Sequence, residues 1–313
     1  MSADKIFVLA LVLLANIIPL SSGSGYVLHV FGNANMDGKI DQEDLATLRE
    51  IISNNMSPTG LADANLDGEV DLRDIAQVEM IINGTEKELS LLDGNDLPIT
   101  INKPVERIVV EYLDNADLMQ ILKKTDKVVG VDLAVAKSPA EFPEMSNRTC
   151  VGAMHKEPDY EKVLSLDPDL LLVFSNVTQE KDKNLPGVPV LFAGLYYPDL
   201  LKPETSAFTD AVRKLGYVLD AQQDAEEYIQ WHMNSLNRLV ESTGSIPDSE
   251  RPTVLVAAYP EADEKTIFTF AQIDTLTSMV DLAGGRTVAS DLPDFMKSTY
   301  RIEVDPEWVL QED

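Results

Sequence analysis

A polar loop followed by an apolar helical pattern occurs twice near the start of this chain, with a period of 30 residues. Residues 32–53 match residues 62–83, and each copy begins with a twelve-residue loop rich in Asp and Asn around one glycine, Gly38 or Gly68. Apolar residues at spacings of three and four follow each loop, which is typical of an amphipathic helix. The duplication therefore predicts a small all-α unit in which two loop–helix elements pack together.

Both loops carry oxygen-bearing residues at the positions that ligate calcium in an EF-hand loop. Such a loop supplies ligands from positions 1, 3, 5, 7, 9 and 12, with glycine at position 6 for a sharp turn. In the first loop the predicted ligands are the side chains of Asn33, Asn35, Asp37, Asp41 and Asp44 and the carbonyl of Lys39. In the second loop they are the side chains of Asp63, Asn65, Asp67, Asp71 and Asp74 and the carbonyl of Glu69. Two Ca²⁺ sites are predicted, and the second, with four carboxylates against three, is expected to bind more tightly.

Two features distinguish these loops from a common EF-hand: position 12 is aspartate in both, and no entering helix is apparent before either loop. Residues 26–89 therefore resemble a type I dockerin, a calcium-dependent module that docks onto cohesin domains. The resemblance implies a cohesin partner that is read by loop positions 10 and 11, which are Gln42, Glu43, Leu72 and Arg73. Ordinary solvated turns and helix-start residues are the alternative interpretation.

The charge balance excludes one class of partner. The 313 residues include 53 acidic and 25 basic side chains, a net charge of −28, so the field of the protein repels phosphate backbones and no nucleic-acid partner is expected. The single cysteine, Cys150, cannot form an internal disulfide, and the sequence has no Cys/His cluster suited to zinc or iron. Stability is therefore expected from packing and from calcium.

An apolar run at residues 6–20 is followed by small residues. Its length and flanks are typical of a secretory signal peptide, here assigned to residues 1–23, and a retained membrane anchor is the alternative. Export predicts a secreted protein with an extracellular, cell-surface or periplasmic location.

Beyond residue 98, short apolar strands alternate with helices, which favours an α/β layer with a mostly parallel sheet. Residues 90–98 are interpreted as a linker, residues 99–202 as a first α/β lobe and residues 246–313 as a second lobe. Between the lobes, residues 203–245 contain a helix of some twenty residues, long enough to bridge about 30 Å. The predicted fold is multidomain: a small all-α EF-hand-like unit followed by a two-lobed α/β domain with a single connecting helix.

Several motifs follow one another in residues 99–313: Arg107-Ile-Val-Val, Asp117-Leu-Met-Gln-Ile-Leu, Asp126-Lys-Val-Val-Gly-Val, and Leu282-Ala-Gly-Gly. Their order and spacing resemble the ABC-transporter solute-binding proteins that bind ferric siderophores, cobalamin or haem. The resemblance implies a periplasmic-binding-protein fold, an ABC permease as partner, and a metal-chelate small molecule held between the lobes. The residues implied as ligand contacts are Tyr112, Tyr197, Tyr259 and Arg301. One acidic residue on each lobe, Asp117 and Glu307, is implied to grip the permease.

An internal echo relates the two lobes: residues 160–167 are similar to residues 306–313. A strand follows the first copy, so a further strand and helix are expected after the second, and the second lobe is interpreted as incomplete. The main alternative function is a dockerin-bearing glycoside-active enzyme, but no carboxylate pair stands out, and GxSxG, HExxH, P-loop and GxGxxG motifs do not occur. A non-catalytic surface scaffold is the second alternative, and the sequence favours a solute-binding protein that is not an enzyme.

Overall fold

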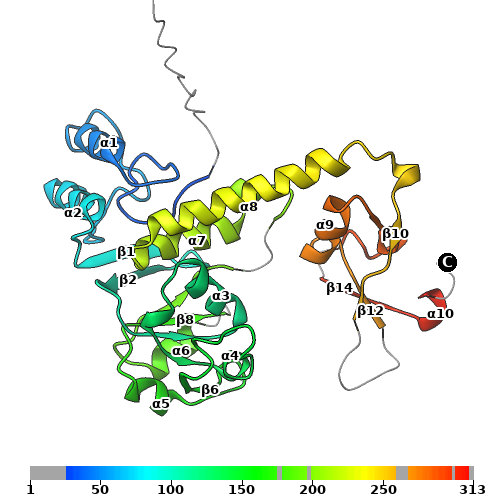
Figure 1. Cartoon of the computed structure of the whole chain (residues 1–313). Helices are drawn as coiled ribbons and strands as arrows, with labels where there is room; N and C mark the ends of the chain where they lie inside the picture. The colour runs from blue at the N-terminus through cyan, green and yellow to red at the C-terminus, as the bar shows by residue number, and fades with distance from the viewer. Residues whose placement is uncertain (1–25, 175–177, 196–198, 259–266, 298–299, 310–313) are drawn as a thin grey trace, which may run out of the picture.

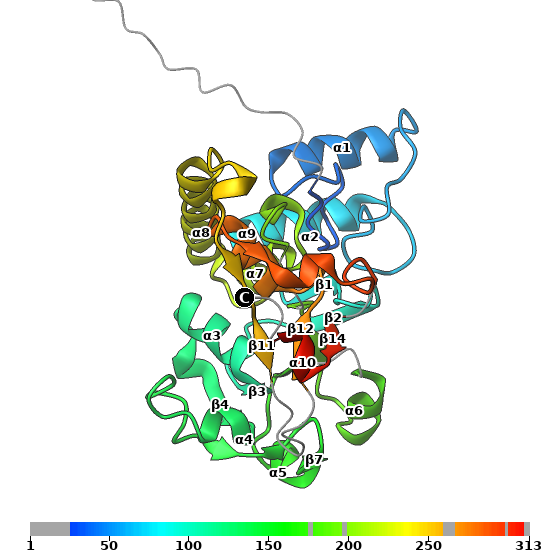
Figure 2. The ribbon, with the colours of Figure 1, turned by 90° about the vertical axis from the view of Figure 1, so that its right-hand side faces the viewer.

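The computed structural model describes residues 26–174, 178–195, 199–258, 267–297 and 300–309. Two α/β lobes lie at either end of one long helix, α8 (Gln222–Thr243), and a helical unit formed by the start of the chain lies against the first lobe and its side of α8 (Figure 1). We call these parts the N-terminal unit, lobe 1 and lobe 2. A second view, turned by 90°, again places the N-terminal unit above lobe 1 (Figure 2).

The predicted signal peptide lies outside the described residues. Within the part of the chain that the structure describes, no helix is both long enough and apolar enough to span a bilayer.

The N-terminal unit contains two similar loop–helix elements. Helices α1 (Gln42–Ile52) and α2 (Leu72–Asn83) each begin after an aspartate N-cap that forms a capping box with the carboxylate three residues later. Leu48 of α1 and Val78 of α2 are completely buried in one apolar cluster, and the two helices contact each other. The duplicated sequence pattern is therefore present as two packed helices.

A β-hairpin follows the N-terminal unit. Its strands, β1 (Glu88–Leu92) and β2 (Pro98–Asn102), pair antiparallel along their full length. Leu91 is completely buried and forms a bridge with Val30, which precedes the first polar loop. The structure therefore differs from the predicted linker at residues 90–98, because the alternating leucines of β1 give it a buried face at the boundary between the N-terminal unit and lobe 1.

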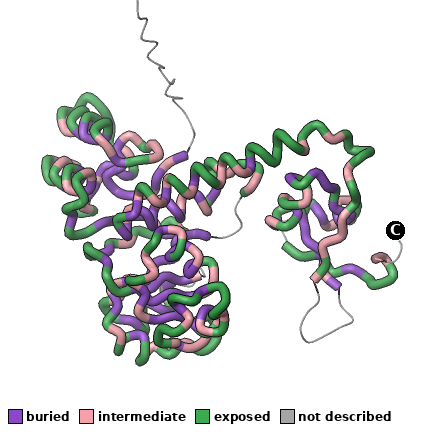
Figure 3. The backbone as a smooth tube through the Cα atoms, in the orientation of Figure 1, coloured by how far each residue is buried: buried purple, intermediate pink, exposed green. Residues whose placement is uncertain are grey.

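Lobe 1 is built on a five-stranded sheet in which all neighbouring strands are parallel. In spatial order its strands are β5 (Thr149–Cys150), β4 (Val128–Val131), β3 (Ile108–Val110), β8 (Leu170–Val173) and β9 (Val190–Phe192). Its other elements are α3 (Leu113–Ile121), α4 (Leu133–Ala136), the short strands β6 (Gly152–Ala153) and β7 (Glu157–Pro158), α5 (Tyr160–Ser165) and α6 (Thr178–Asn184). Strands β3 and β8 are buried throughout, and Figure 3 shows that the interior of lobe 1 is buried, which is typical of a parallel sheet covered by helices.

Helix α7 (Ala207–Val218) packs against α8, which at 1.5 Å per residue runs for about 33 Å toward lobe 2. Lobe 2 contains a parallel pair, β10 (Thr253–Val254) and β13 (Arg286–Thr287), an antiparallel sheet of β11 (Ala257–Ala258), β12 (Ile267–Phe270) and β14 (Arg301–Val304), and helices α9 (Thr275–Leu282) and α10 (Pro306–Val309). Short 3₁₀ segments occur at Thr125–Lys127, Pro203–Thr205, Asp248–Glu250 and Val288–Asp291. The predicted two-lobed α/β fold with one connecting helix is confirmed.

Candidate functional site

A cavity of about 590 Å³ lies where lobe 1, the connecting helices and lobe 2 meet. Lobe 1 contributes residues that follow β3, β8 and β9, helices α7 and α8 contribute one side, and the N-terminus of α9 contributes from lobe 2. Open α/β sheets bind ligands beyond the carboxyl ends of their strands. This inter-lobe cavity is therefore the candidate ligand site of the chain.

Two rings in close, tilted contact form the lobe 1 wall of the cavity. The ring centroids of Tyr112, after β3, and Phe174, after β8, are 4.3 Å apart. Tyr112 has a φ of 72°, which is uncommon for a residue with a side chain. Beneath the rings, the buried carboxylate of Glu111 pairs with Lys181 at 3.0 Å and accepts a hydrogen bond from the backbone N–H of Phe174 at 3.3 Å. This ion pair ties the ends of β3 and β8 to α6 and so fixes the position of the rings.

A second aromatic pair comes from the connecting helices. The ring of Phe208 on α7 lies 6.1 Å from that of Tyr228 on α8, and both line the cavity. The ring of His232, one turn further along α8, lies 5.7 Å from Phe208. Burial lowers the pKa of His232, so this imidazole is neutral at neutral pH.

Three carboxylates also line the cavity. Asp114 and Asp117 project from α3, and Asp274 is the N-cap of α9, where its side chain accepts a hydrogen bond from the N–H of Leu276 at 2.9 Å. Removal from water raises the pKa of Asp114, and burial together with the charges of Glu141 and Asp114 raises the pKa of Asp117. The cavity is thus both aromatic and acidic.

Only some of the residues predicted to contact a ligand or a permease can be placed relative to the cavity. Tyr112 lines the cavity, whereas Arg301 does not: its guanidinium lies 5.9 Å from the ring centroid of Phe270 within lobe 2. Tyr197 and Tyr259 lie outside the described residues. Asp117, predicted to grip a permease, lines the cavity, while Glu307 is exposed on α10.

Other lining residues were not predicted. Phe208 and Tyr228 belong to helical apolar patterns, and sequence periodicity alone does not show that such residues face a cavity rather than a core. Asp274 precedes α9 as an ordinary N-cap, so only its position in the fold reveals its second role. Phe174 directly follows a buried strand, and this placement was the one available signal.

The first polar loop is closed on itself by side-chain hydrogen bonds. The side-chain oxygen of Asn33 accepts from the N–H of Asp37 at 3.1 Å, and the amide of Asn35 donates to the Asp37 carboxylate at 2.9 Å. Asp44 accepts from the N–H of Asn35 at 3.1 Å. Loop positions 1, 3, 5 and 12 are therefore brought together.

The second loop repeats this arrangement. Asp63 accepts from the N–H of Asp67 at 3.1 Å, Asn65 donates to the Asp67 carboxylate at 3.0 Å, and Asp74 accepts from the N–H groups of Ala64 and Asn65. Corresponding contacts at positions 1, 3, 5 and 12 in both copies show that the repeat extends from sequence to side-chain geometry.

The donor chemistry of the loops fits a hard divalent cation. Asp44 and Asp74 are completely buried, and burial raises the pKa of Asp44 to about 6 and also raises that of Asp74. Asp41 and Asp71 serve as N-caps of α1 and α2 and also pair with Lys39 and Arg73. Across the described residues, no three acidic, His or Cys side chains converge as a metal cluster, and Asp44 and Asp74 accept hydrogen bonds from loop N–H groups. An oxygen-rich site of this kind also draws on amide and carbonyl oxygens, which both loops supply.

The residues predicted to read a protein partner are exposed. Gln42 and Glu43 are exposed at the start of α1, and Leu72 is 72% exposed at the start of α2. Arg73 reaches back over its own loop, where its guanidinium lies 2.5 Å from Asp67. The two copies therefore present different chemistry at corresponding positions.

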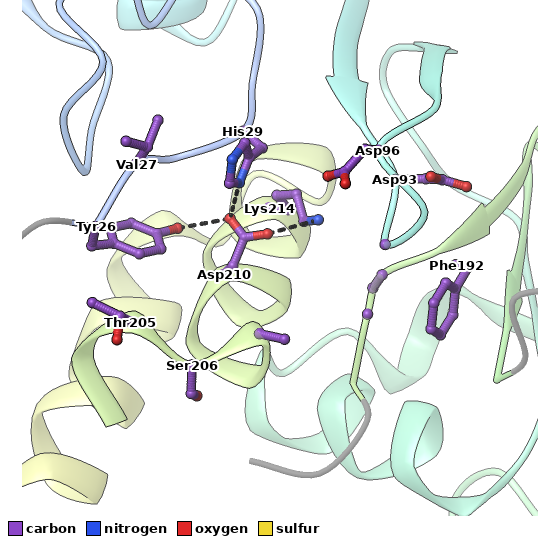
Figure 4. Close-up of a pocket in the computed structure, with 14 residues that line it drawn as sticks. Tyr26, Val27, His29, Asp93, Asp96, Phe192, Thr205, Ser206, Asp210 and Lys214 are labelled. Carbon is purple, nitrogen blue, oxygen red and sulfur yellow. Dashed lines mark hydrogen bonds and ion pairs between the residues drawn. The ribbon is translucent and has the colours of Figure 1, made fainter. Parts of the chain in front are cut away.

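A second cavity, of about 500 Å³, lies between the N-terminal segment and lobe 1 (Figure 4). At its centre the carboxylate of Asp210 on α7 accepts hydrogen bonds from Tyr26 at 3.0 Å and from Lys214 at 2.8 Å, and lies 3.3 Å from Nδ1 of His29. Burial alone raises the pKa of Asp210, but His29 and Lys214 lower it overall, and the same contact raises the pKa of His29. These contacts join the N-terminal segment to α7.

Comparisons with known proteins agree with this architecture. Among solved structures, the molybdate periplasmic binding protein MolA of Haemophilus influenzae has a TM-score of 0.56 at 20% identity, over 71% of this chain and 71% of that chain. The heme binding protein HmuT has a TM-score of 0.53 at 14% identity, over 71% and 68% of the two chains. The petrobactin-binding protein YclQ of Bacillus subtilis has a TM-score of 0.53 at 18% identity, over 64% and 67%. At such identities these likenesses establish the fold alone.

A search of the curated proteins finds no match to this sequence. A family model described as periplasmic binding protein, however, matches residues 108–313, which is most of the chain. The match spans both lobes and the helix between them, and so agrees with the architecture and with the position of the inter-lobe cavity. The chain therefore belongs to the periplasmic binding protein family, whose members bind solutes and are not enzymes.

Proposed function

We propose that this chain is the solute-binding component of an ABC importer and that its ligand occupies the inter-lobe cavity. The observation that carries the proposal is the cavity itself, which draws side chains from both lobes and from the helices that connect them. A ligand that contacts both lobes favours their closed arrangement, because it binds that arrangement better than an open one.

The proposed ligand is a metal chelate of the iron-siderophore, cobalamin or haem type. Two of the similar structures are named for haem and petrobactin, and a third was solved with molybdate. The aromatic rings of Tyr112, Phe174, Phe208 and Tyr228 offer apolar area to the organic part of a chelate. A bare oxyanion makes little use of such a surface, which supports the chelate classes over molybdate.

Intrinsic fluorescence of the full chain tests this proposal. The ring centroid of Trp231 lies 5.5 Å from that of Tyr228, which lines the cavity. Titration with a ferric hydroxamate, cobalamin or haem is expected to change the emission saturably for one of them. Tyr228→Ala should weaken that binding, whereas Tyr160→Ala, which alters a tyrosine of α5 that does not line the cavity, should not. Silence for all three ligands would exclude the chelate classes and favour a surface scaffold.

We also propose that the N-terminal unit is a calcium-dependent dockerin that binds a cohesin domain. The hydrogen-bonded gathering of loop positions 1, 3, 5 and 12 in both copies supports this interpretation. Two calcium ions would be held by the side chains of loop positions 1, 3, 5, 9 and 12 and by the carbonyls of Lys39 and Glu69. Bound calcium would neutralise the negative charge of the loop carboxylates. Leu72 and its exposed neighbours at loop positions 10 and 11 would then face the cohesin.

Calorimetry of the full chain with Ca²⁺ tests the first half of this proposal, with two sites as the expected result. Capture on an immobilised cohesin, with and without a chelator, tests the second. Leu72→Ala is expected to weaken capture, and Leu201→Ala, which truncates another strongly exposed leucine, serves as its matched control. Calcium-independent folding with no cohesin capture would contradict the dockerin interpretation.

The permease contacts remain part of the proposal in modified form. Glu307 is exposed at the start of α10 and is available to a membrane partner. Asp117 lies in the cavity lining, a position that supports a ligand contact in preference to a permease contact.

A further inference from the structure

We infer that the inter-lobe cavity takes a ligand with net positive charge, an organic cation or a cationic metal chelate, and rejects anionic ligands. The inference rests on the proposed solute-binding function and narrows it to one charge class. Within the chelate classes, it disfavours those whose carboxylate or catecholate groups leave them negatively charged.

The first argument is the charge of the lining. Asp114, Asp117 and Asp274 line the cavity, and none of the described lining residues is Lys, Arg or His. None of these three carboxylates forms an ion pair within the described part of the chain. A cavity with carboxylates on two opposing elements, α3 and α9, concentrates negative potential between them.

The second argument is that the buried lysines are already paired with carboxylates. Three lysines, Lys103, Lys181 and Lys214, are buried in the described structure, and each is paired with a carboxylate at 3.0 Å or less. Lys181 lies just behind the aromatic wall, but Glu111 neutralises it. The positive charge of Lys181 is therefore already compensated and offers little to an anion.

The third argument is the state of the carboxylates. Asp274 is only 7% exposed, and removal from water raises the pKa values of Asp114 and Asp117. A carboxylate that is buried, as at Asp274, or half-buried, as at Asp117, lacks part of the solvation that water provides, and a bound cation would compensate for it, whereas Asp114 is exposed. An anion would instead add repulsion to a site that already disfavours negative charge.

The remaining lining suits a cation with organic surface. The faces of Tyr112, Phe174, Phe208 and Tyr228 carry negative quadrupole charge, so they attract a cation within about 6 Å. The hydroxyl of Thr275, at the start of α9, is buried and has no hydrogen-bond partner among the described residues. A ligand that fills the cavity would give this hydroxyl a partner, which is a separate indication that the space is built for a ligand.

Three inert cobalt(III) complexes of similar shape and different charge test the inference. They are tris(bipyridine)cobalt(III), which is cationic, tris(acetylacetonato)cobalt(III), which is neutral, and tris(oxalato)cobalt(III), which is anionic. Equilibrium dialysis of each complex against the full chain measures binding through the cobalt content. We expect the cationic complex to bind at least about tenfold more tightly than the neutral one, and the anionic complex not to bind saturably.

Two sets of variants separate local from long-range charge. The double variant Asp114→Asn, Asp117→Asn is expected to lose about tenfold in affinity for the cationic complex and to keep its affinity for the neutral one. Asp126→Asn removes one exposed carboxylate of lobe 1 that does not line the cavity, so it should behave as wild type. The cationic affinity of wild type should also fall with added salt more steeply than that of the double variant.

The outcomes distinguish this inference from the proposed function. The charge inference is overturned if the chain prefers the anionic complex, or if the Asp126 variant and the double variant change the affinity for the cationic complex equally. Either result leaves solute binding intact. Failure of the cationic complex to bind, while haem, whose carboxylates make it anionic, binds saturably, also overturns it. The proposed function itself is contradicted only if the ferric hydroxamate, cobalamin and haem also fail to bind.

Discussion

The hydroxyl oxygen of Tyr217 on α7 accepts a hydrogen bond from the backbone N–H of Ile40, at 2.9 Å. Ile40 occupies position 8 of the first polar loop, so this contact joins the predicted calcium loop to the helices that connect the two lobes. Arg213, one turn earlier on α7, lies over the ring of Tyr26 at 4.5 Å. The N-terminal unit is therefore packed against the binding protein and is not a module on a free tether.

Tyr217→Phe is expected to destabilise the protein because it leaves the N–H of Ile40, a residue that is only 7% exposed, without its acceptor. An unpaired buried donor costs about 1–3 kcal/mol. Urea unfolding of both proteins measures the difference. Tyr228→Phe is the matched control, because no hydrogen bond of the Tyr228 hydroxyl occurs among the described residues. Equal free energies of unfolding for the two variants would show that the contact contributes nothing.

A buried ion pair provides a second link across the same boundary. Lys103 and Glu86 have side chains that are 2% exposed, and Lys103 also donates to the carbonyls of Tyr217 and Val218 at the end of α7. Lys103→Met leaves Glu86 buried and unpaired, so we expect a loss of about 3–5 kcal/mol in the free energy of unfolding. Adding Glu86→Gln should recover part of this loss. If Lys103→Met alone has the same free energy of unfolding as wild type, the ion pair does not stabilise the protein.

Periodicity and spacing predicted the elements of this fold well. The parallel sheet of lobe 1 follows from short apolar strands such as β8, which is buried throughout, and the long amphipathic pattern of α8 predicted the connecting helix. Strand β1 and its pairing with β2 were missed, because the polar residues that surround its short run of leucines favoured a linker over residues 90–98. The hairpin also contacts residues that are distant in sequence, through the bridge from Leu91 to Val30 and the hydrogen bond from the N–H of Gly94 to the carbonyl of Phe192.

The candidate site was less predictable than the fold. Tyr112 was identified because it follows a buried strand, and strand ends converge at one edge of a parallel sheet. Asp274 and Tyr228 reach the same cavity through the packing of α8 and α9, which no local pattern encodes. The prediction for Asp117 used a family position, but the orientation of α3 turns that side chain toward the cavity.

The contact between His29 and Asp210 makes stability depend on pH. The hydrogen bond to Asp210 raises the pKa of His29 above its ordinary value of 6.5, with Asp96 adding to the shift and Lys214 opposing it. Its stabilisation is therefore fully present below pH 6.5 and is lost as pH rises through the raised pKa. Asp210 has a lowered pKa, so its contribution to stability is present above its ordinary value of 3.8 and is lost as pH falls through the lowered pKa.

His29→Gln tests this pH dependence. Wild type should be more stable than the variant near about pH 5.5, by less than about 1 kcal/mol because His29 is partly exposed, and the difference should shrink near about pH 8.5. Thermal unfolding at several pH values measures it. His232→Gln is the control. Burial lowers the pKa of His232, so protonation of this residue at acid pH favours unfolding, and the variant should gain stability relative to wild type as pH falls. A constant gap between wild type and His29→Gln at all pH values contradicts the assignment.

The two polar loops differ at position 1, and this difference predicts their relative calcium affinity. Asn33 uses its amide to donate to the carbonyls of Leu28 and Asp37, whereas Asp63 is charged and accepts from the N–H groups of Asp67 and Gly68. Asp63→Asn should therefore lower the affinity of the second site about tenfold and bring it close to the first. Asn33→Asp should not give the reciprocal gain, because it also removes two donated hydrogen bonds of a completely buried side chain. Calorimetric titration of both variants with Ca²⁺ measures the two affinities, and a first site that is the tighter one in wild type contradicts the prediction.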